Sequence, residues 1–189
     1  MKKKKLAVIF PGIGYHKDKP LLYYAAKLVQ SHGYDIIHIE YHDMPGKIKG
    51  DAAMMKKAAE IAFMQTEDRL KDVEFSDYDE VIFIGKSIGT VALAKYVSDH
   101  KINAKQVWYT PVEATLLFPS KDVIAFIGDA DPWSDLNVIK EKAGELQINL
   151  YLFERCNHSL ETGNVSTDTR NIHEVMDITE DFISRSEKM

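Results

Sequence analysis

A serine flanked by glycines follows an apolar run near the middle of the chain. Residues 85–89 read Gly-Lys-Ser-Ile-Gly and come directly after Val-Ile-Phe-Ile at residues 81–84. A serine at a sharp turn from a strand into a helix has an exposed hydroxyl, and flanking glycines keep side chains away from the neighbouring backbone. The pattern predicts that Ser87 is a nucleophile.

An acid and a histidine follow Ser87 in chain order. Asp129 and Asp131 lie in a Gly-Asp-Ala-Asp segment after a second apolar run, and His158 follows a third. A serine hydroxyl is a weak nucleophile at neutral pH, so acyl transfer needs an imidazole to accept its proton and a carboxylate to orient that imidazole. Ser87, His158 and one of the two aspartates therefore predict an acyl-transfer triad.

Each of these residues also has a purely structural interpretation. Ser87 is of a type that caps helices, and either aspartate can order a turn or cap the helix that we expect near Ser134. His158 can be a simple loop residue, since His16 and His42 also lie near predicted strand ends. The serine, acid and histidine together favour the catalytic interpretation.

Six short apolar runs alternate with segments of helical periodicity. This alternation predicts a three-layer α/β/α sandwich around a mainly parallel six-stranded sheet. In such sheets, ligands bind beyond the carboxyl ends of the strands, where Ser87, Asp131 and His158 are all expected. The predicted strands are residues 6–10, 35–40, 81–84, 106–109, 123–127 and 148–153, and the clearest amphipathic helix covers residues 172–183.

The chain resembles the α/β-hydrolase family, in particular its small, capless, esterase-like members. The resemblance rests on four segments: Phe-Pro-Gly-Ile-Gly at 10–14, the pentapeptide at 85–89, Gly-Asp-Ala-Asp at 128–131 and Asn-His-Ser at 157–159. It implies a single domain over residues 1–189 that lacks the family's two leading strands. It also implies a sheet order of 2-1-3-4-5-6.

The resemblance further implies roles for individual residues. The family's spacing favours Asp131 over Asp129 as the acid. The turn after the first strand matches the family's oxyanion loop, so the backbone amides of Ile13 and Ile88 are the implied donors to a developing oxyanion. Pro-Gly replaces the family's common His-Gly in this turn, which leaves Gly14 as an alternative to Ile13.

Several residues beside these positions are candidates for lining a substrate pocket. They are Gly14, Tyr15, His16, Lys86 and Trp133. Their alternative interpretations are a loop aromatic, a solvated charge and a core or rim indole. The sequence indicates no metal and no organic cofactor, and its helix methionines are typical of packing.

The segment between the fourth and fifth predicted strands bears on the substrate. Residues 111–121 are too few for the cap domain that the family commonly inserts there. Leu116, Leu117 and Phe118 either form a small apolar flap over an acyl group or pack against the sheet. An open site favours a small soluble ester or thioester as the substrate.

Composition narrows the classes of partner. With 24 basic and 29 acidic residues the formal charge is −5, which offers no broad positive field for nucleic acid. Cys156 is the only cysteine, so an intramolecular disulfide is excluded. No apolar run approaches the length of a membrane span, and we expect a cytoplasmic protein that acts on a small-molecule acyl substrate.

The leading hypothesis is therefore a carboxylesterase-like hydrolase acting on an ester or thioester. An amidase or an acyltransferase would use the same triad. The competing class is a non-catalytic binding or regulatory protein that retains the fold, because fold does not fix function.

Overall fold

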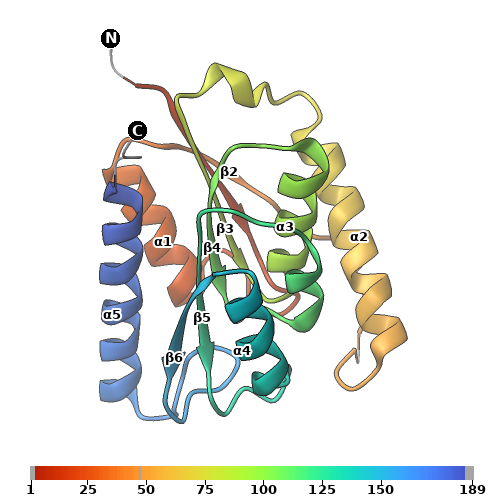
Figure 1. Ribbon diagram of the computed structural model, residues 1–189, viewed down its shortest axis with the longest axis vertical. Coiled ribbons are helices and arrows are strands. Elements are labelled where there is room, and N and C mark those ends of the chain that lie inside the picture. The colour runs from red at the N-terminus through yellow and green to blue at the C-terminus, as the bar shows by residue number, and fades with distance from the viewer. Residues whose placement is uncertain (1–2, 47, 186–189) are drawn as a thin grey trace.

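The computed structural model describes residues 3–46 and 48–185, which form a parallel sheet between two layers of helices (Figure 1). The six strands occur in the order β2-β1-β3-β4-β5-β6, all parallel, which confirms the predicted architecture and strand order. The strands are β1 (Lys5–Phe10), β2 (Asp35–His38), β3 (Glu80–Lys86), β4 (Lys105–Tyr109), β5 (Val123–Gly128) and β6 (Asn149–Phe153).

The helices lie on both faces of the sheet. Helices α1 and α5 cover one face, and α2, α3 and α4 cover the other (Figure 1). Their bounds are α1 (Pro20–Ser31), α2 (Ala52–Leu70), α3 (Ile88–His100), α4 (Leu136–Glu145) and α5 (Val165–Ser184), with 3₁₀ turns η1 (Phe75–Asp77) and η2 (Glu113–Leu117).

The central strands are apolar because both of their faces are buried. Successive side chains point to opposite faces of a strand, so Phe83 packs in the core beneath α2 and α3, whereas Ile84 packs in the core beneath α1 and α5. Complete burial of a side chain of this size stabilises the fold by roughly 1.5–3 kcal/mol. Both faces of the sheet are therefore packed against helices.

Strand register places the candidate residues at one edge. Phe10 pairs with Gly85, so β1 and β3 end level with each other and their following loops meet. Gly128 pairs with Phe153 in the same way at the ends of β5 and β6. The loops that carry Ser87, Asp131 and His158 thus all leave the carboxyl edge of the sheet.

Side-chain caps fix where the functional helices begin. Asp51 accepts a hydrogen bond from the amide of Met54 at the start of α2, and Asp135 accepts one from the amide of Asn137 at the start of α4. Helix α5 begins at Val165, seven residues before the amphipathic pattern predicted, because its first two turns are mostly exposed and polar. Neither 3₁₀ turn was predicted.

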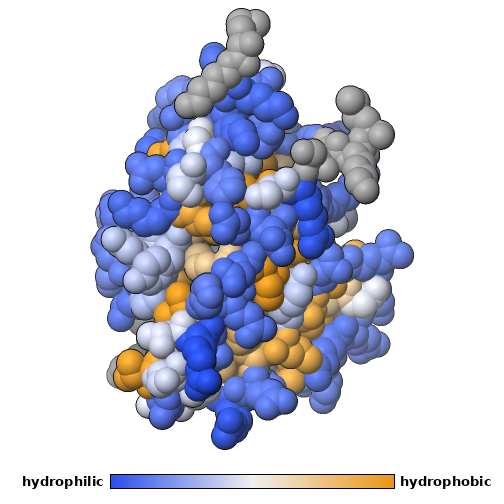
Figure 2. Space-filling model, turned by 90° about the vertical axis from the view of Figure 1, so that its left-hand side faces the viewer, coloured by the Kyte–Doolittle hydropathy of each residue, from blue (hydrophilic) through white to orange (hydrophobic). Residues whose placement is uncertain are grey.

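The face formed by α1 and α5 is mostly hydrophilic, with smaller hydrophobic patches among the charged residues (Figure 2). None of the helices in the described ranges is long and apolar enough to cross a membrane.

Candidate active site

Ser87 lies in a strained turn between β3 and α3. Its backbone has φ 55° and ψ −123°, a conformation that costs a non-glycine residue on the order of 1–3 kcal/mol. The turn is held because the amide of Ser87 donates to the carbonyl of Tyr109 (3.0 Å), while its own carbonyl accepts from the amide (2.8 Å) and hydroxyl (2.6 Å) of Thr90. The surrounding structure thus fixes a conformation that projects the Ser87 hydroxyl from the turn.

The flanking glycines are required by close packing. A Cβ on Gly85 would collide with the side chain of Leu93, and a Cβ on Gly89 would lie 2.5 Å from the carbonyl oxygen of Pro11. The second contact is important for the site because it brings the loop after β1 against the start of α3. Both glycines therefore have the steric role that the sequence pattern predicted.

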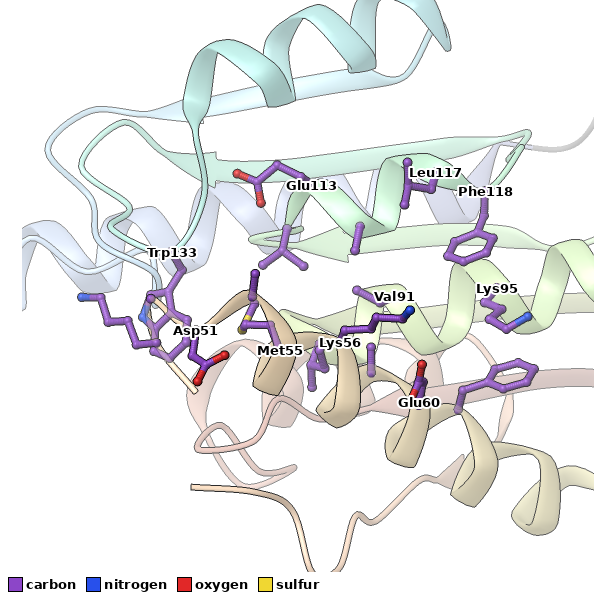
Figure 3. Close-up of a pocket in the computed structure, with 18 of the residues that line it drawn as sticks. Asp51, Met55, Lys56, Glu60, Val91, Lys95, Glu113, Leu117, Phe118 and Trp133 are labelled. Carbon is purple, nitrogen blue, oxygen red and sulfur yellow. The ribbon is translucent and has the colours of Figure 1, made fainter. Parts of the chain in front are cut away.

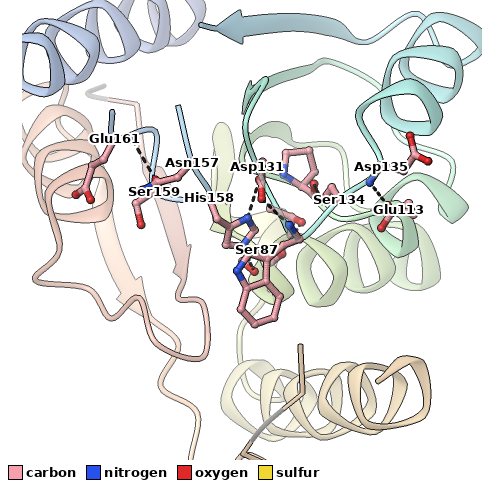
Figure 4. Close-up of polar contacts among 12 residues, drawn as sticks. Ser87, Glu113, Asp131, Ser134, Asp135, Asn157, His158, Ser159 and Glu161 are labelled. Carbon is pink, nitrogen blue, oxygen red and sulfur yellow. Dashed lines mark hydrogen bonds and ion pairs between the residues drawn. The ribbon is translucent and has the colours of Figure 1, made fainter. Parts of the chain in front are cut away.

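The structure brings Ser87, His158 and Asp131 together in one hydrogen-bonded chain (Figure 4). Nε2 of His158 lies 2.7 Å from Oγ of Ser87, and Nδ1 of His158 lies 2.7 Å from Oδ2 of Asp131. The Asp131 side chain is 1% exposed and that of His158 is 15% exposed. This geometry leaves Nε2 free to accept the serine proton, because Asp131 holds the proton on Nδ1.

The two aspartates of the Gly-Asp-Ala-Asp segment have different partners. Asp131 bonds His158 through one oxygen and accepts the amide of Trp133 (2.9 Å) through the other. Asp129 accepts the amide of Arg155 and orders the adjoining turn. Of the two aspartates, Asp131 is therefore the one that contacts His158.

The loop that carries His158 is fixed by its own polar contacts. Oδ1 of Asn157 accepts the amides of Ser159 (2.7 Å) and Glu161 (3.2 Å). The carbonyl of Cys156 accepts the amide of Ala130 (3.1 Å), which ties this loop to the one that carries Asp131. Gly128 permits that approach, since a Cβ there would collide with the backbone of Cys156.

The environment of His158 favours the neutral imidazole. Burial lowers its pKa below the ordinary value of 6.5, and the charge of Lys86 acts in the same direction. The hydrogen bond to Asp131 opposes this shift. The indole of Trp133 stacks on the imidazole with ring centroids 5.4 Å apart. A neutral histidine near pH 7 is the form that can act as a base.

The implied oxyanion donors lie on either side of Ser87. Ile88 is the first residue of α3, so its amide is one of those without an intrahelical acceptor. Ile13 lies in a turn closed by the amide of Gly12 and the carbonyl of Tyr15 (3.0 Å). A Cβ on Gly12 would lie 3.4 Å from the Cβ of Ser87, which shows how close this turn is to the nucleophile.

The pocket-lining candidates lie in different places. Lys86 is 1% exposed, so its interpretation as a solvated charge is wrong; its ammonium lies 5.1 Å from the ring centroid of Tyr15. Tyr15 is buried, and its hydroxyl accepts the amide of Leu21. His16 is largely exposed beside Asp18, and Gly14 is also exposed. Trp133 is the one candidate of this group that lines the groove described next.

A groove that the sequence did not predict, called here the α2–α3 groove, begins at Ile88 and Trp133 beside the triad and is lined by α2, α3 and η2 (Figure 3). Its volume is about 1000 Å³. Leu117 and Phe118 line it, and Leu117 is 74% exposed, whereas Leu116 packs in the core. The three residues proposed as a flap thus divide between the two alternatives. No group of three or more metal-binding side chains occurs within residues 3–46 and 48–185.

Comparisons with known proteins find similarity at the level of structure. No protein-family model matches the sequence, and neither does any curated protein sequence. An esterase of Pyrococcus furiosus superposes with a TM-score of 0.68 at 13% identity, covering 97% of this chain and 83% of that one. Mouse alpha/beta hydrolase domain-containing protein 10 superposes with a TM-score of 0.68 at 11% identity, covering 97% of this chain and 91% of that one.

A third similar structure is a serine hydrolase without a lid from Xanthomonas campestris. It superposes with a TM-score of 0.61 at 10% identity, covering 97% of this chain and 82% of that one. Identities this low bear on architecture and leave substrate and mechanism to the residues of this chain. The parallel sheet, its strand order and these superpositions show that the protein has the α/β-hydrolase fold.

Proposed function

We propose that the protein is a serine hydrolase that cleaves an ester or thioester through an acyl-enzyme on Ser87. The observation that carries this proposal is the unbroken Ser87–His158–Asp131 hydrogen-bond chain, with both contacts at 2.7 Å. The strained turn at Ser87 adds support, since strain of this kind concentrates at functional sites.

The proposed reaction proceeds in two halves. Oγ of Ser87 attacks the acyl carbonyl carbon while Nε2 of His158 takes its proton, and the carbonyl oxygen becomes an oxyanion. As the tetrahedral intermediate collapses, the bond to the leaving group breaks and His158 returns the proton to that group. Water then attacks the acyl-enzyme with the same assistance, releasing the acid and regenerating Ser87.

Two further groups support this chemistry. Asp131 would stabilise the imidazolium that forms at His158, and it has no need to become protonated itself. The amides of Ile88 and Ile13 would bind the oxyanion, and the loss of one such donor typically costs about 3 kcal/mol of transition-state stabilisation. The N-terminus of α3 adds a favourable dipole at the same point.

Covalent labelling tests the nucleophile directly. A fluorophosphonate probe should label the wild-type protein and should fail to label Ser87→Ala. Ser159→Ala, which changes a neighbouring serine, should be labelled like the wild type. No Ser87-dependent labelling of the folded protein, together with no turnover of a panel of esters and thioesters, would favour a non-catalytic binding role.

The same panel tests the acid. Asp131→Asn should lower kcat by about 10³–10⁴, because His158 loses the partner that fixes its tautomer. Asp129→Asn is the matched control and should retain most of the turnover, since Asp129 contacts only the turn at Arg155. The reverse ranking would contradict the assignment of Asp131.

A further inference from the structure

The α2–α3 groove is a long apolar channel whose walls come from three elements. Met55, Ala59 and Phe63 line it from α2, Ile88 and Val91 from α3, and Ala114 from η2. Figure 3 shows Trp133 at one end, with Leu117, Phe118 and Lys95 at the other. Its volume of about 1000 Å³ is at the upper end of the range for small-molecule sites, which is roughly 300–1,000 Å³.

One end of the groove is built from residues that contact the triad. Trp133 stacks on His158, and its amide donates to Asp131. Ile88 directly follows Ser87 in the chain. A group attached to the carbonyl carbon at Ser87 can therefore continue into the groove.

The charged side chains that line the groove are either paired with other residues or hydrated, so its inner surface is mainly apolar. Asp51 caps α2, Glu113 accepts an amide hydrogen bond from Asp135, and Lys95 pairs with Asp99. Lys56 and Glu60 on α2 are exposed, so their charges remain hydrated. Lys49, at the triad end of the groove, is also exposed, and its ammonium lies 5.7 Å from the ring centroid of Trp133. An extended peptide would leave its backbone hydrogen-bonding groups unpaired in such a channel, whereas a hydrocarbon chain has none to satisfy.

The length of the groove sets the size of the chain that it can hold. The helix from Ala52 to Met64 spans about 18 Å, at 1.5 Å per residue. A ten-carbon chain, whose nine bonds extend over roughly 14 Å at about 1.5 Å per carbon–carbon bond, fits within that length. At the far end, the Lys95 ammonium lies 4.3 Å from the ring centroid of Phe63 and 5.6 Å from that of Phe118, so it joins the two walls.

We propose that the α2–α3 groove binds the acyl chain of the substrate, so that the preferred substrates are esters or thioesters of medium-chain, unbranched, apolar acids. This inference rests on the proposed hydrolase function and replaces the expectation of a small acyl group with one of about ten carbons. The leaving group would lie on the opposite side of Ser87, outside the groove.

A series of p-nitrophenyl esters from acetyl to palmitoyl tests the proposal. The value of kcat/KM should rise about two- to fourfold per added methylene, as expected for progressive burial of the chain. It should then level off or fall once the chain exceeds the groove. A profile that is flat, or that is highest for acetyl, with Ser87-dependent turnover intact, would overturn the proposal and leave the hydrolase function standing.

Variants of the groove wall localise the effect. Ala59→Phe places a ring in the middle of the channel and should lower the ratio of kcat/KM for the decanoyl ester to that for the acetyl ester at least tenfold. Ala114→Phe narrows the channel from the opposite wall and should do the same, which provides a second variant if one fails to fold. Ala53→Phe makes the same change at an exposed alanine of α2 outside the groove and should leave the ratio unchanged.

A binding measurement separates this inference from the catalytic proposal. Ser87→Ala protein should bind one decanoate per chain by calorimetry, and the added Ala59→Phe change should abolish that binding. Failure to bind decanoate would count against the groove even if the enzyme were active. Binding without any Ser87-dependent labelling would instead support an apolar-chain site in a protein that lacks the proposed activity. A concentration-dependent dimer that Ala59→Phe disrupts would identify the occupant as a second copy of the chain and overturn the proposal.

Discussion

The buried lysine beside the nucleophile gives the site an unusual charge balance. Lys86 precedes Ser87, and its ammonium lies over the ring of Tyr15 without a hydrogen bond or ion pair to any residue that the structure describes. Burial lowers its pKa from 10.5 to about 7, although the charges of Asp131 and Glu161 act in the opposite direction. The Lys86 side chain therefore carries its positive charge mainly below about pH 7.

Replacement of Lys86 should change the pH dependence of catalysis. The positive charge of Lys86 lowers the pKa of His158, so Lys86→Met should raise that pKa and move the acid limb of kcat/KM to higher pH, by roughly 0.5–1 unit. Activity should fall near pH 6 and change little at pH 8. The pH profile of p-nitrophenyl ester hydrolysis measures this shift, and Lys140→Met, at an exposed position of α4, is the control. An acid limb that stays in place, or moves to lower pH, would show that Lys86 does not act on His158.

The same substitution should change stability with a defined sign. The folded-state pKa of Lys86 is below its unfolded value, so the unfolded chain binds more protons between about pH 7 and pH 10 and the free energy of unfolding contributed by Lys86 rises with pH there. Lys86→Met should remove this slope, and it should be more stable than the wild type at pH 6. Urea unfolding at pH 6 and at pH 9 measures the difference.

At the residue scale, the sequence predicted that three residues lie together but not their environment. Ser87, Asp131 and His158 each follow a strand, and the loops after parallel strands meet at the same edge of a sheet. The family resemblance favoured Asp131 over Asp129, although both have the same type of side chain. In the structure Asp131 is hydrogen-bonded to His158, whereas Asp129 accepts the amide of Arg155. The burial of Lys86 was missed because a lysine within a turn motif is usually hydrated.

At the scale of elements, the packing of β1, β3 and α3 determines where the proposed oxyanion loop lies. Gly89 in α3 has the backbone of Phe10 and Pro11 against it, so the helix start and the loop after β1 can approach closely. Gly144 in α4 is also helical, but it has open space where a Cβ would be. These two helical glycines therefore allow a crowded site to be compared with an open one.

Alanine substitutions at the two glycines should have opposite effects. Gly89→Ala forces the loop that contains Ile13 away from Ser87, so it should lower both kcat and the unfolding free energy, the latter by about 1–3 kcal/mol. Gly144→Ala should raise the unfolding free energy by about 0.4–1 kcal/mol, because the unfolded chain loses conformational freedom, and should leave kcat unchanged. Denaturant unfolding and ester turnover measure both effects. Equal stability changes at the two sites would contradict the packing role of Gly89.

The groove was not predicted, although the helix that lines it was. The alanine- and methionine-rich segment predicted a helix at residues 52–63, and the helix extends to Leu70. Its apolar residues were interpreted as packing, and Met54 and Met55 do contact the core, but Met55 also lines the groove. The distance between α2 and η2 depends on the tertiary packing of segments about fifty residues apart in the sequence. A local sequence pattern therefore cannot show whether side chains fill the space between them or leave a groove.

At the scale of the whole molecule, the two faces differ. The face of α1 and α5 is mostly hydrophilic, whereas the other face contains the apolar groove (Figures 2 and 3). Above the groove, the connection from β4 to β5 contains only the short turn η2, and Leu117 at its end remains exposed. An acyl chain can therefore enter from solvent without the displacement of a larger structural element.

This open access predicts the kinetics with aggregating substrates. Enzymes whose lid must open at a lipid surface gain activity when the substrate forms micelles, because the interface stabilises the open state. In the described part of this chain no element covers the groove, so we expect no gain in activity from the opening of a lid. The rate with p-nitrophenyl decanoate should follow a single hyperbola through the substrate's critical micelle concentration, measured with and without detergent. A sharp rise at that concentration would show that a closed form exists, and the exposed turn at Leu117 would be the first segment to examine by introducing Leu117→Ala.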